Sequence, residues 1–478
     1  MADDQVFGMG EQERARPTWP ALTEDEVAHA VAATWGGAQP LVIEWRSPRP
    51  LSSTVGVRCS DGARLVVKRL PLRLRDEAAL AEEHRFTAHL RAAGIPVPEA
   101  RAVVGDRLSG TVARRSAPGN SGPDSTANEV AARRSAKRDS RRDSAEGEVV
   151  VRRSATGGSG HDSTEREVVV RRSATGGSGH DSTEREVVVR RSATGGSGRD
   201  SIEGEAASRQ LTTGDAGRGR TGQEAAGGFV YEVQRAGVGE DRYREDFSWS
   251  PYRDTVDAAA AGAMLARLHL AATGFDAPPR PARPLVSTMH GGVISAVDWH
   301  IARRPALARF LADRDWRTEV PDLRADLTAA TPLWTHGDWH PTNLLWQSHE
   351  VSSVIDFGLA DRTTAMFDLA TAVERSAVDW VSLRDGGPAH VRTDQITALI
   401  EAYRSVRPLA AGEQTLLTDL LPLVHIGYEL SEIDYFLTVA HDPHNAEIAY
   451  RDWLIGHLHW YISPAGQDLL ATVRAAAA

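Results

Sequence analysis

Alternating apolar and polar positions predict a small sheet in the first half of the chain. Five runs rich in apolar and β-branched residues are typical of strands, and they occupy residues 41–45, 55–59, 64–70, 101–104 and 229–234. The dipeptide Asp61-Gly62, between the second and third runs, is a turn signal. These runs predict a small domain built on a mixed sheet.

Helical patterns precede, interrupt and follow these strands. The capping box Thr23-x-x-Glu26 predicts a helix that extends to about residue 33, and a second helix is expected over residues 75–93. Beyond Asp257 the pattern is mostly helical, with expected helices at residues 258–271, 366–383, 396–406, 416–436 and 448–462. The chain is therefore expected to have an α+β fold, with a small mixed-sheet lobe followed by a larger helical lobe.

A tandem repeat interrupts the first lobe. The motif Arg-Arg-Ser recurs every 19 residues in five copies that span residues 110–204, and a stretch rich in Gly, Arg and Thr continues to residue 227. The apolar residues of the repeats are Val, Ala and one Ile, which bury little area against an ordering cost of about 1–2 kcal/mol per residue. We therefore expect residues 110–227 to be disordered, although the run Val-Val-Val is also compatible with a short strand in each repeat.

The chain divides into five segments on these patterns. They are a disordered start (1–20), the first part of the small lobe (21–109), the insertion (110–227), the last strand with a hinge (228–238) and the helical lobe with the chemical site (239–478). Loop-closure entropy grows slowly with loop length, so a disordered insertion between two strands is compatible with a folded lobe.

Composition excludes several classes of function. The 478 residues carry a formal net charge of −10, which gives no general basic footprint for nucleic acid. A single cysteine, Cys59, excludes an internal disulfide framework and a multi-cysteine zinc site. No apolar run is long enough to span a membrane, and the first 20 residues lack the pattern of a signal peptide. We expect a cytoplasmic protein that binds neither nucleic acid nor membrane.

The most informative segment is Thr335-His-Gly-Asp-Trp-His-Pro-Thr-Asn-Leu-Leu-Trp346, followed by Ser352-Ser-Val-Ile-Asp-Phe-Gly358. Two short apolar runs with a polar turn between them predict a hairpin that has Asn343 at its entry and Asp356 at its exit. Oxygen ligands at neighbouring strand ends suit Mg²⁺. Asp338 precedes Asn343 by five residues, which is the catalytic-loop spacing of kinases, and Asp-Phe-Gly is their metal-binding sequence.

On these motifs the chain resembles the aminoglycoside phosphotransferase and choline-kinase-like family, which has the protein-kinase-like fold. The resemblance covers the residues outside the insertion and is strongest at His336-Gly337-Asp338, Ile355-Asp356-Phe357-Gly358 and Phe367-Asp368-Leu369-Ala370. It implies that Asp338 is the catalytic base, that Asn343 and Asp356 hold magnesium, and that Asp368 braces the catalytic loop. It also implies ATP and Mg²⁺ as cofactors and a hydroxyl group of a small molecule as the phosphate acceptor.

Lys68 is expected to bind the nucleotide phosphates. The chain has 55 basic residues but only two lysines, and Lys68 ends an apolar run, as the phosphate-pairing lysine of a kinase sheet does. Its expected partner is Glu83 on the core-facing side of the following helix, with Glu82 as second choice. His336 and His340 are interpreted as structural residues of the catalytic loop.

The nucleotide loop departs from the pattern of the family. Residues 47–54 contain no glycine, although glycine allows the closest approach of backbone amides to phosphate. We expect the amides and hydroxyls of Ser52 and Ser53 to substitute. The resemblance also implies that the backbone of Val233 and Arg235 meets adenine. The sequence also departs from the family pattern at residues 361–365, where many relatives have a Gly-Asp-Pro turn.

The sequence of the helical lobe does not identify the phosphate acceptor. From residue 365 to the end there are 15 acidic residues and 7 arginines, a net charge of −8. Glu429, Glu432 and Asp434 are interpreted as a solvated helix face, with a site for a cationic acceptor (an amino sugar or amino alcohol) as the alternative; a neutral sugar also stays open. Three tryptophans are interpreted as core residues rather than sugar-stacking ones, namely Trp380, Trp453 and Trp460.

Two other functions stay open besides a small-molecule kinase. A metal-dependent hydrolase built on His336, Asp338 and His340 would leave Lys68 and Asp356 without a role. A catalytically weak pseudokinase or interaction module is favoured by the glycine-free loop and disfavoured by the intact set of kinase residues.

Overall fold

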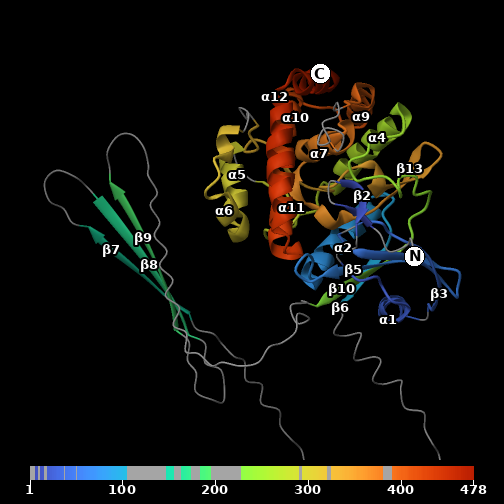
Figure 1. The fold of residues 1–478 in the computed structure, drawn as a ribbon, viewed down its shortest axis with the longest axis horizontal. Coiled ribbons are helices and arrows are strands. Elements are labelled where there is room, and N and C mark those ends of the chain that lie inside the picture. Colours follow the sequence, from blue (N-terminus) through green and yellow to red (C-terminus); the bar gives the residue numbers. More distant parts are fainter. Residues whose placement is uncertain are drawn as a thin grey trace, which may run out of the picture. The chain divides into compact units, whose positions relative to one another are not determined.

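The structure is a computed structural model, and it describes residues 6–8, 11–15, 19–36, 38–49, 51–104, 147–155, 163–173, 184–194, 228–289, 293–319, 325–380 and 390–478. The chain forms two compact units. One comprises Met1–Pro118 with Gln223–Ala478, and the other comprises Gly119–Gly222. The larger unit contains a sheet with two helices beside a group of further helices (Figure 1).

The sheet of the larger unit is antiparallel and has five strands in the order β3-β4-β5-β10-β6. Their bounds are Pro40–Arg46 (β3), Ser53–Cys59 (β4), Arg64–Pro71 (β5), Ala100–Val104 (β6) and Phe229–Arg235 (β10). All five strands were predicted from the apolar pattern. The insertion separates β6 from β10, which are nevertheless neighbours, with Val104 opposite Val230.

Strand alternation divides the residues of this sheet between its two faces. On one face Val55, Val67 and Val233 pack with helix α1 (Glu24–Trp35) in a small core. Helix α1 begins at the predicted capping box of Thr23 and Glu26. The opposite face carries Lys68 on β5 directly across from Glu232 on β10. Polar side chains therefore project from the face that is turned away from α1.

Helix α2 (Glu77–Ala92) joins the sheet to the larger core. Asp76 caps its N-terminus by accepting a hydrogen bond from the Ala79 amide, 2.8 Å away. Its buried residues Leu80, Phe86 and Leu90 belong to the core of the helical part. The ring of Phe86 packs against Phe357, with ring centroids 5.9 Å apart. The helix thus contacts the segment that follows Asp356.

The helical part contains the predicted helices with different boundaries, together with α5, α6, α11 and α13, which were not predicted. Its helices are α4 (Thr255–Ala272), α5 (Val293–Ala302), α6 (Pro305–Leu311), α7 (Ala365–Ala377), α9 (Thr393–Val406), α10 (Ala411–Tyr435), α11 (Pro443–Ile448), α12 (His457–Ile462) and α13 (Pro464–Ala477). Helix α7 ends six residues before the predicted boundary at 383. The helix expected over 448–462 is instead π-helical over Ala449–Gly456 and α-helical from His457.

Two short strand pairs lie among these helices and position the polar loops. Strand β11 (Pro332–Thr335) pairs with β14 (Asp361–Thr364), and β12 (Leu344–Gln347) pairs with β13 (Glu350–Val354). The second pair is the predicted hairpin. The segment that departs from the Gly-Asp-Pro pattern forms β14, and its Thr364 caps α7 by accepting a hydrogen bond from the Phe367 amide.

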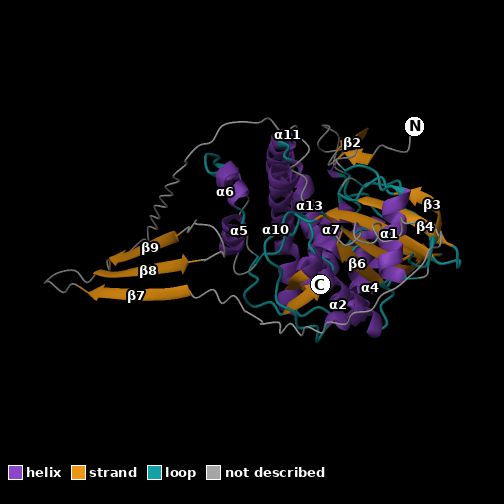
Figure 2. Ribbon diagram, turned by 90° about the horizontal axis from the view of Figure 1, so that it is seen from below, coloured by secondary structure: helices purple, strands orange, loops and turns teal. Residues whose placement is uncertain are grey.

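The smaller unit contains a three-stranded antiparallel sheet built from the repeats (Figure 2). Its strands are β7 (Gly147–Ala155), β8 (Ser163–Ser173) and β9 (Glu184–Thr194). Val-Val-Val runs of neighbouring copies face one another, with Val150 opposite Val169 and Val169 opposite Val188. Where the structure describes the repeats, they therefore follow the strand interpretation. The expectation of disorder for the rest of 110–227 lies outside the described residues.

The start of the chain also contains strands. Within residues 1–20, which were expected to be disordered, β1 (Val6–Gly8) pairs with β2 (Glu11–Ala15). Val and Phe favour extended backbone, which is the local reason for the first of these strands.

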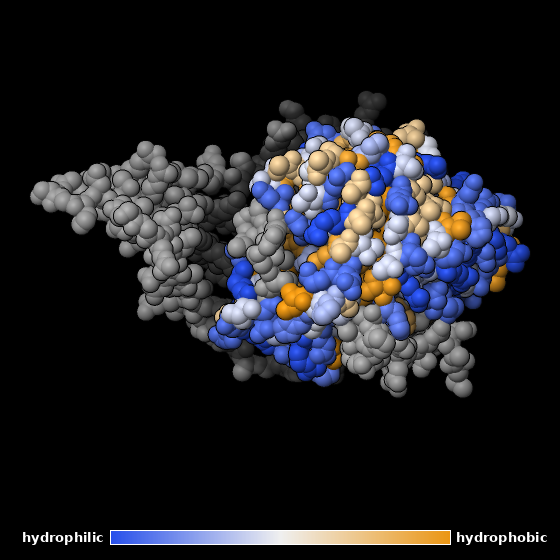
Figure 3. Space-filling model, turned by 90° about the horizontal axis from the view of Figure 1, so that it is seen from above, coloured by the Kyte–Doolittle hydropathy of each residue, from blue (hydrophilic) through white to orange (hydrophobic). Residues whose placement is uncertain are grey.

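The described surface shows no broad apolar face. The large exposed apolar side chains are few and scattered, and they are Leu41, Val42, Val238, Val256, Leu270 and Ile462. The face in Figure 3 accordingly mixes hydrophilic and hydrophobic residues. Among the described helices, none combines the length and the hydropathy needed to cross a membrane.

Candidate active site

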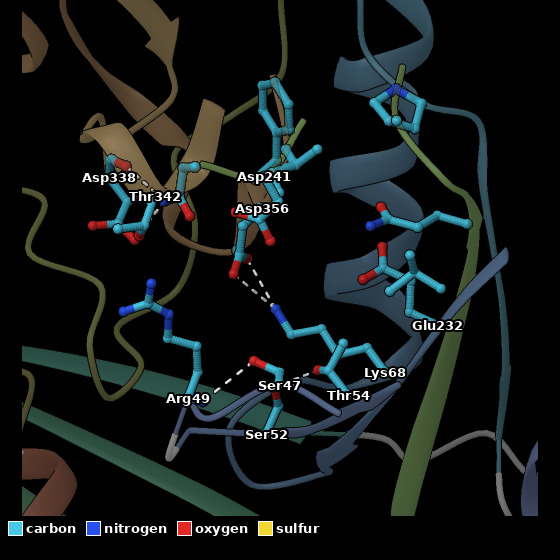
Figure 4. A pocket seen from close by; sticks show the side chains of 18 of the residues that line it. Ser47, Arg49, Ser52, Thr54, Lys68, Glu232, Asp241, Asp338, Thr342 and Asp356 are labelled. Atoms are coloured by element: carbon cyan, nitrogen blue, oxygen red, sulfur yellow. Dashed lines mark hydrogen bonds and ion pairs between the residues drawn. The ribbon is translucent and has the colours of Figure 1, made fainter. Parts of the chain in front are cut away.

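A cavity of about 610 Å³ lies where the sheet meets the helical part (Figure 4). The polar face of the sheet contributes Lys68 and Glu232, and the loops of the helical part contribute Asp338, Asn343 and Asp356. These residues are up to 288 positions apart in the chain. The structure therefore brings the predicted lysine, aspartates and asparagine into one cavity.

Lys68 and Asp356 form the contact that links the two parts across the cavity. Lys68 Nζ donates to Asp356 Oδ1 at 2.9 Å and to Oδ2 at 3.0 Å. Withdrawal from water would by itself raise the pKa of Asp356, but the Lys68 ammonium outweighs this effect and lowers that pKa. Asp356 has left-handed backbone, with φ 59°, which is rare for residues other than glycine and turns the chain sharply after β13.

Asp338 is held by three polar neighbours. Arg375 Nη2 donates to its Oδ1 at 2.7 Å, His340 Nε2 lies 3.3 Å from the same oxygen, and Asn343 Nδ2 donates to Oδ2 at 3.2 Å. Burial would raise the pKa of Asp338, but Arg375 and His340 outweigh it and hold the pKa far below the ordinary value. The carboxylate is therefore anionic throughout the physiological range.

Asn343 lies beside the catalytic-loop residues and at the entry of the hairpin. Its side-chain nitrogen donates to the backbone oxygen of Asp338 at 2.9 Å, while its own backbone oxygen accepts from the Ile355 amide at 3.0 Å. These two bonds place Asn343 next to the residue that precedes Asp356. Since the nitrogen is used by Asp338, the amide oxygen is the atom that can bind a cation.

Asp368 holds the loop from His336 to Asp338 in place through hydrogen bonds. The two carboxylate oxygens of Asp368 accept hydrogen bonds from the backbone amides of His336 at 3.0 Å and Gly337 at 2.8 Å. Gly337 has φ 76°, and a Cβ there would lie 2.2 Å from the backbone oxygen of Leu359. Only glycine fits at this position.

The two histidines of the loop have structural contacts. His336 Nε2 donates to the backbone oxygen of Ile355 at 3.0 Å, and His336 Nδ1 accepts from the Asp338 amide at 3.2 Å. His340 Nδ1 lies 2.9 Å from Thr342 Oγ1. Both rings are buried and their nitrogens have partners within the loop, as their structural interpretation requires.

Glu83 has a different partner from the one predicted. Among the described residues no ion pair joins it to Lys68; Glu83 Oε1 instead lies 2.7 Å from Arg75 Nη1 and 2.8 Å from Arg280 Nη2. Glu83 is buried, as the core-facing interpretation required, but two arginines compensate its charge there. Its second-choice alternative, Glu82, pairs with Arg85 at 3.4 Å.

The carboxylate beside Lys68 on the sheet is Glu232. It lies opposite Lys68 in the strand register, and its Oε1 is 2.8 Å from His84 Nε2 on α2. Burial would raise the pKa of Glu232, but His84 and Lys68 outweigh this effect and lower it. Helix α2 therefore connects to the cavity through a histidine and a strand glutamate.

Of the two serines of the nucleotide loop, only one lines the cavity. Ser52 does so, and its hydroxyl lies 3.0 Å from Thr54 Oγ1. Ser53 Oγ is turned toward the start of α1, where it accepts from the Leu22 amide at 3.1 Å. Its hydroxyl is thereby removed from the cavity.

Val233 and Arg235 also lie away from the cavity, in contrast to the expectation for adenine contacts. The backbone oxygen of Val233 accepts from Trp35 Nε1 at 3.2 Å, and the Arg235 amide donates to the backbone oxygen of Glu99 at 2.9 Å. Alternation along β10 is the reason, because it turns the even positions toward the cavity. The cavity lining at this edge consists of Glu232, Gln234, Ala236 and Gly237.

Two arginines in the cavity were not found from the sequence. Arg375 on α7 holds Asp338, and its guanidinium also lies over the ring of Tyr428, 4.3 Å from the centroid. Arg49, in the glycine-free loop, projects into the cavity in Figure 4, and its Nη2 donates to the backbone oxygen of Tyr243 at 3.1 Å. In a chain with 53 arginines, neither has a local sequence signal that distinguishes it.

The acidic residues of α10 are buried, so their interpretation as a solvated face is wrong. The exposed fractions are 3% for Glu429, 0% for Glu432 and 5% for Asp434, and none of the three lines the cavity. Burial, the largest cause, raises the pKa of Glu432 to about 8. Helix α10 is enclosed by other helices, which the count of charges could not reveal. The three tryptophans interpreted as core residues are buried, as predicted.

The antiparallel sheet, the helical part and the loop residues between them agree with the protein-kinase-like fold expected from the motifs. Residues 179–409 match the family model described as the phosphotransferase enzyme family. This match covers a little less than half of the chain and agrees with the resemblance inferred from its motifs.

Curated relatives include two homoserine kinases. The one from Methylobacillus flagellatus is 28% identical over 205 residues, which is 42% of this chain and 58% of the relative. The one from Methylobacillus glycogenes is 29% identical over 180 residues, which is 37% of this chain and 51% of the relative. The chain thus spans little more than half the length of the curated relatives it matches.

Solved structures with a related outline include a macrolide 2'-phosphotransferase from Brachybacterium faecium and an amicoumacin kinase in complex with AMP-PNP. The first is 13% identical with a TM-score of 0.41 and covers 89% of this chain and 98% of its own. The second is 11% identical with a TM-score of 0.40, and the match covers 89% of this chain and 87% of the amicoumacin kinase. Similarities this distant say nothing about the substrate.

Proposed function

We propose that the protein is a kinase that transfers a phosphoryl group from ATP, with Mg²⁺, to a hydroxyl group of a small molecule. The observation that carries the proposal is the contact of Lys68 with Asp356 in a cavity that also holds Asp338 and Asn343. A lysine on the sheet and an aspartate at a strand end are the groups that kinases use for phosphate and metal.

The oxygen-bearing side chains fit magnesium. Asp356 offers a carboxylate and Asn343 an amide oxygen from the two ends of one hairpin, which is the kind and number of protein ligand that Mg²⁺ takes when phosphate and water supply the rest. Bound there, the ion would neutralise charge on the phosphates. Lys68 and Arg49 would bind phosphate oxygens, with Arg49 supplying by its side chain what a glycine-rich loop supplies by amides.

Asp338 would orient the acceptor hydroxyl and receive its proton. Its low pKa makes it a weak base, so it suits a reaction in which the hydroxyl loses its proton late, after the phosphoryl group has begun to transfer. Arg375 fixes the carboxylate through one oxygen and Asn343 contacts the other. Positioning by these contacts is the main contribution of this loop.

Homoserine is the first acceptor to test, because the curated relatives are described as homoserine kinases. Sugars, amino sugars and amino alcohols are the further candidates. The idea that Glu429, Glu432 and Asp434 bind a cationic acceptor has no support in the geometry, since these groups are buried outside the cavity.

The test is ADP production with Mg-ATP across these acceptors. We expect turnover with at least one acceptor, and a loss of about 10²–10⁴-fold in kcat for Asp338→Asn. Asp326→Asn, at an exposed position, is the matched control and keeps wild-type turnover. Mg-ATP should also raise the thermal midpoint of the wild type and of Asp338→Asn.

Two outcomes would contradict the proposal. Thermal stabilisation by Mg-ATP without turnover on any acceptor would favour the pseudokinase alternative. Stabilisation by zinc but not by Mg-ATP would favour the hydrolase alternative, although the partners of His336 and His340 within the loop already disfavour it.

A further inference from the structure

A second group of potential ligands lies in the helical part, outside the cavity. His425 and Glu429 on α10 and His457 at the start of α12 each offer a ligand atom, and these three atoms lie within 4.8 Å of one another. All three residues are buried, with exposed fractions of 1%, 3% and 5%. We call this group the His425 cluster; none of its members lines the proposed active site.

Several polar atoms of the cluster lack a hydrogen-bond partner among the described residues. They are both ring nitrogens of His457 and one carboxylate oxygen of Glu429; the carboxyl groups of Glu429 and the adjacent Glu432 interact with each other. Buried polar atoms without a partner are rare because each one costs free energy. Their proximity makes the cluster a candidate ligand site.

Three buried carboxyl groups lie around the cluster. Glu374, Glu429 and Glu432 are all at most 3% exposed. The nearby guanidinium of Arg375 is paired with Asp338. A divalent cation here would interact favourably with carboxylates whose ionisation burial otherwise disfavours.

The residue types and their spacing fit a transition metal. His425 and Glu429 are four positions apart and so lie on one face of α10, and His457 adds a second imidazole from another helix. Two histidines and one carboxylate are a ligand set typical of zinc and similar ions.

The surroundings of His425 also fit. Its Nδ1 lies 2.8 Å from Glu374 Oε1 and its Nε2 lies 3.1 Å from the backbone oxygen of Trp453. A metal ion at one ring nitrogen would replace that nitrogen's present contact and leave the other to donate to its acceptor, which is how proteins orient a metal-binding histidine.

We propose that His425, Glu429 and His457 bind a divalent transition metal ion of the zinc type, with Glu432 available as a fourth ligand. The ion joins α10 to α12, and through Glu374 it is connected to α7, which carries Arg375. Its role is structural, because the site lies outside the cavity and the ligands come from packed helices. The competing explanation is a core of neutral side chains, in which Trp380 stacks on His457 with centroids 4.5 Å apart.

The test measures metal directly. The full chain is stripped with a chelator, loaded with Co²⁺ or Zn²⁺, passed over a desalting column and analysed for bound metal and for the visible absorption of protein-bound Co²⁺. We expect one equivalent per chain, a d–d spectrum typical of tetrahedral cobalt, and a thermal midpoint several degrees higher than that of the stripped protein.

Variants assign the ligands. His457→Gln and Glu429→Gln should each lose the bound metal and the metal-dependent rise in thermal midpoint. His459→Gln is the matched control, since His459 lies on the same helix with a half-exposed side chain that pairs with Glu319. It should bind metal as the wild type does.

The proposal is overturned if the wild type retains only substoichiometric metal, shows no cobalt d–d band and melts at the same temperature with and without metal. Equal metal binding by Glu429→Gln and the wild type would also overturn it. If a variant fails to fold, the wild-type cobalt spectrum still decides the question. ATP turnover is not needed for any of these readouts, so the result is independent of the proposed kinase activity.

Discussion

Arg49 occupies the place where a glycine-rich loop would approach a nucleotide. Burial lowers the pKa of its guanidinium, and the aspartates around the cavity, Asp338 and Asp356 among them, partly offset that effect. The side chain is therefore a cation directed toward the site of phosphate binding proposed above. A loop whose backbone amides do not come close to the phosphates can still neutralise phosphate charge through an arginine side chain.

Replacing Arg49 tests this role. We expect Arg49→Gln to raise KM for ATP about tenfold with a smaller change in kcat, because it removes a ground-state contact to phosphate. Arg49→Lys should recover part of the loss, since it keeps the charge but not the bidentate geometry. Steady-state kinetics with ATP varied at saturating acceptor measures both values. An unchanged KM in Arg49→Gln would show that the loop binds phosphate without this side chain.

At the scale of single residues, short motifs predicted most of the site. Asp338, Asn343 and Asp356 stand at fixed short spacings in loops and at strand ends, so local sequence was enough to place them together. Glu83 was expected to pair with Lys68 but contacts Arg75, eight positions earlier, and Arg280, almost 200 positions later. No periodicity carries information about a pairing over that distance.

At the scale of secondary structure elements, one histidine connects α2 to the candidate active site. His84 pairs with Glu232 on the strand next to Lys68, and this contact fixes the helix against the cavity side of the sheet. Burial lowers the pKa of His84, but Glu232 outweighs burial and the net pKa lies above the ordinary value of 6.5. The raised pKa favours the protonated form of His84, which pairs with the Glu232 carboxylate.

The stability that this pair contributes depends on pH. Because the folded-state pKa of His84 is raised, the contribution is fully present below about pH 6.5 and is lost as the pH rises through the folded-state value. We expect His84→Gln to lower the thermal midpoint by about 2 °C near pH 6, and the difference from the wild type to vanish near pH 9. Thermal unfolding over this range is the measurement.

A matched variant controls for the loss of a helix histidine. His89→Gln lies on the same helix, and its ring contacts the backbone oxygen of Ala271 rather than a carboxylate. It should show no comparable dependence on pH. A His84→Gln difference that grows toward pH 9 would contradict the assigned sign.

Elements were predicted well where their pattern is local and less well where packing decides. All five strands of the main sheet and the hairpin after Asn343 follow from alternation. The direction of the backbone groups of Val233 and Arg235 does not, because it depends on which neighbouring strand each position faces. The burial of α10 depends likewise on the helices that surround it, so its acidic residues were placed in solvent.

At the scale of the whole molecule, the insertion leaves the sheet intact. Strands β6 and β10 pair along five positions although the repeats separate them in sequence. The predicted tolerance of the lobe to a long insertion at this place agrees with that pairing.

Deleting residues 110–227 tests whether the insertion is needed. We expect the shortened chain to fold, with a thermal midpoint within a few degrees of the full chain and with ATP-dependent turnover changed by less than about twofold, since the loop-closure term changes slowly with length. Circular dichroism and the ADP assay measure the two quantities. An unfolded product would mean that the repeats stabilise the catalytic unit.

The pairing of Val104 with Val230 has an evolutionary consequence. Because β6 and β10 pair on either side of the insertion, we expect gain or loss of whole 19-residue copies to leave the paired sheet residues unchanged. Related chains are then expected to differ in copy number while keeping this pairing.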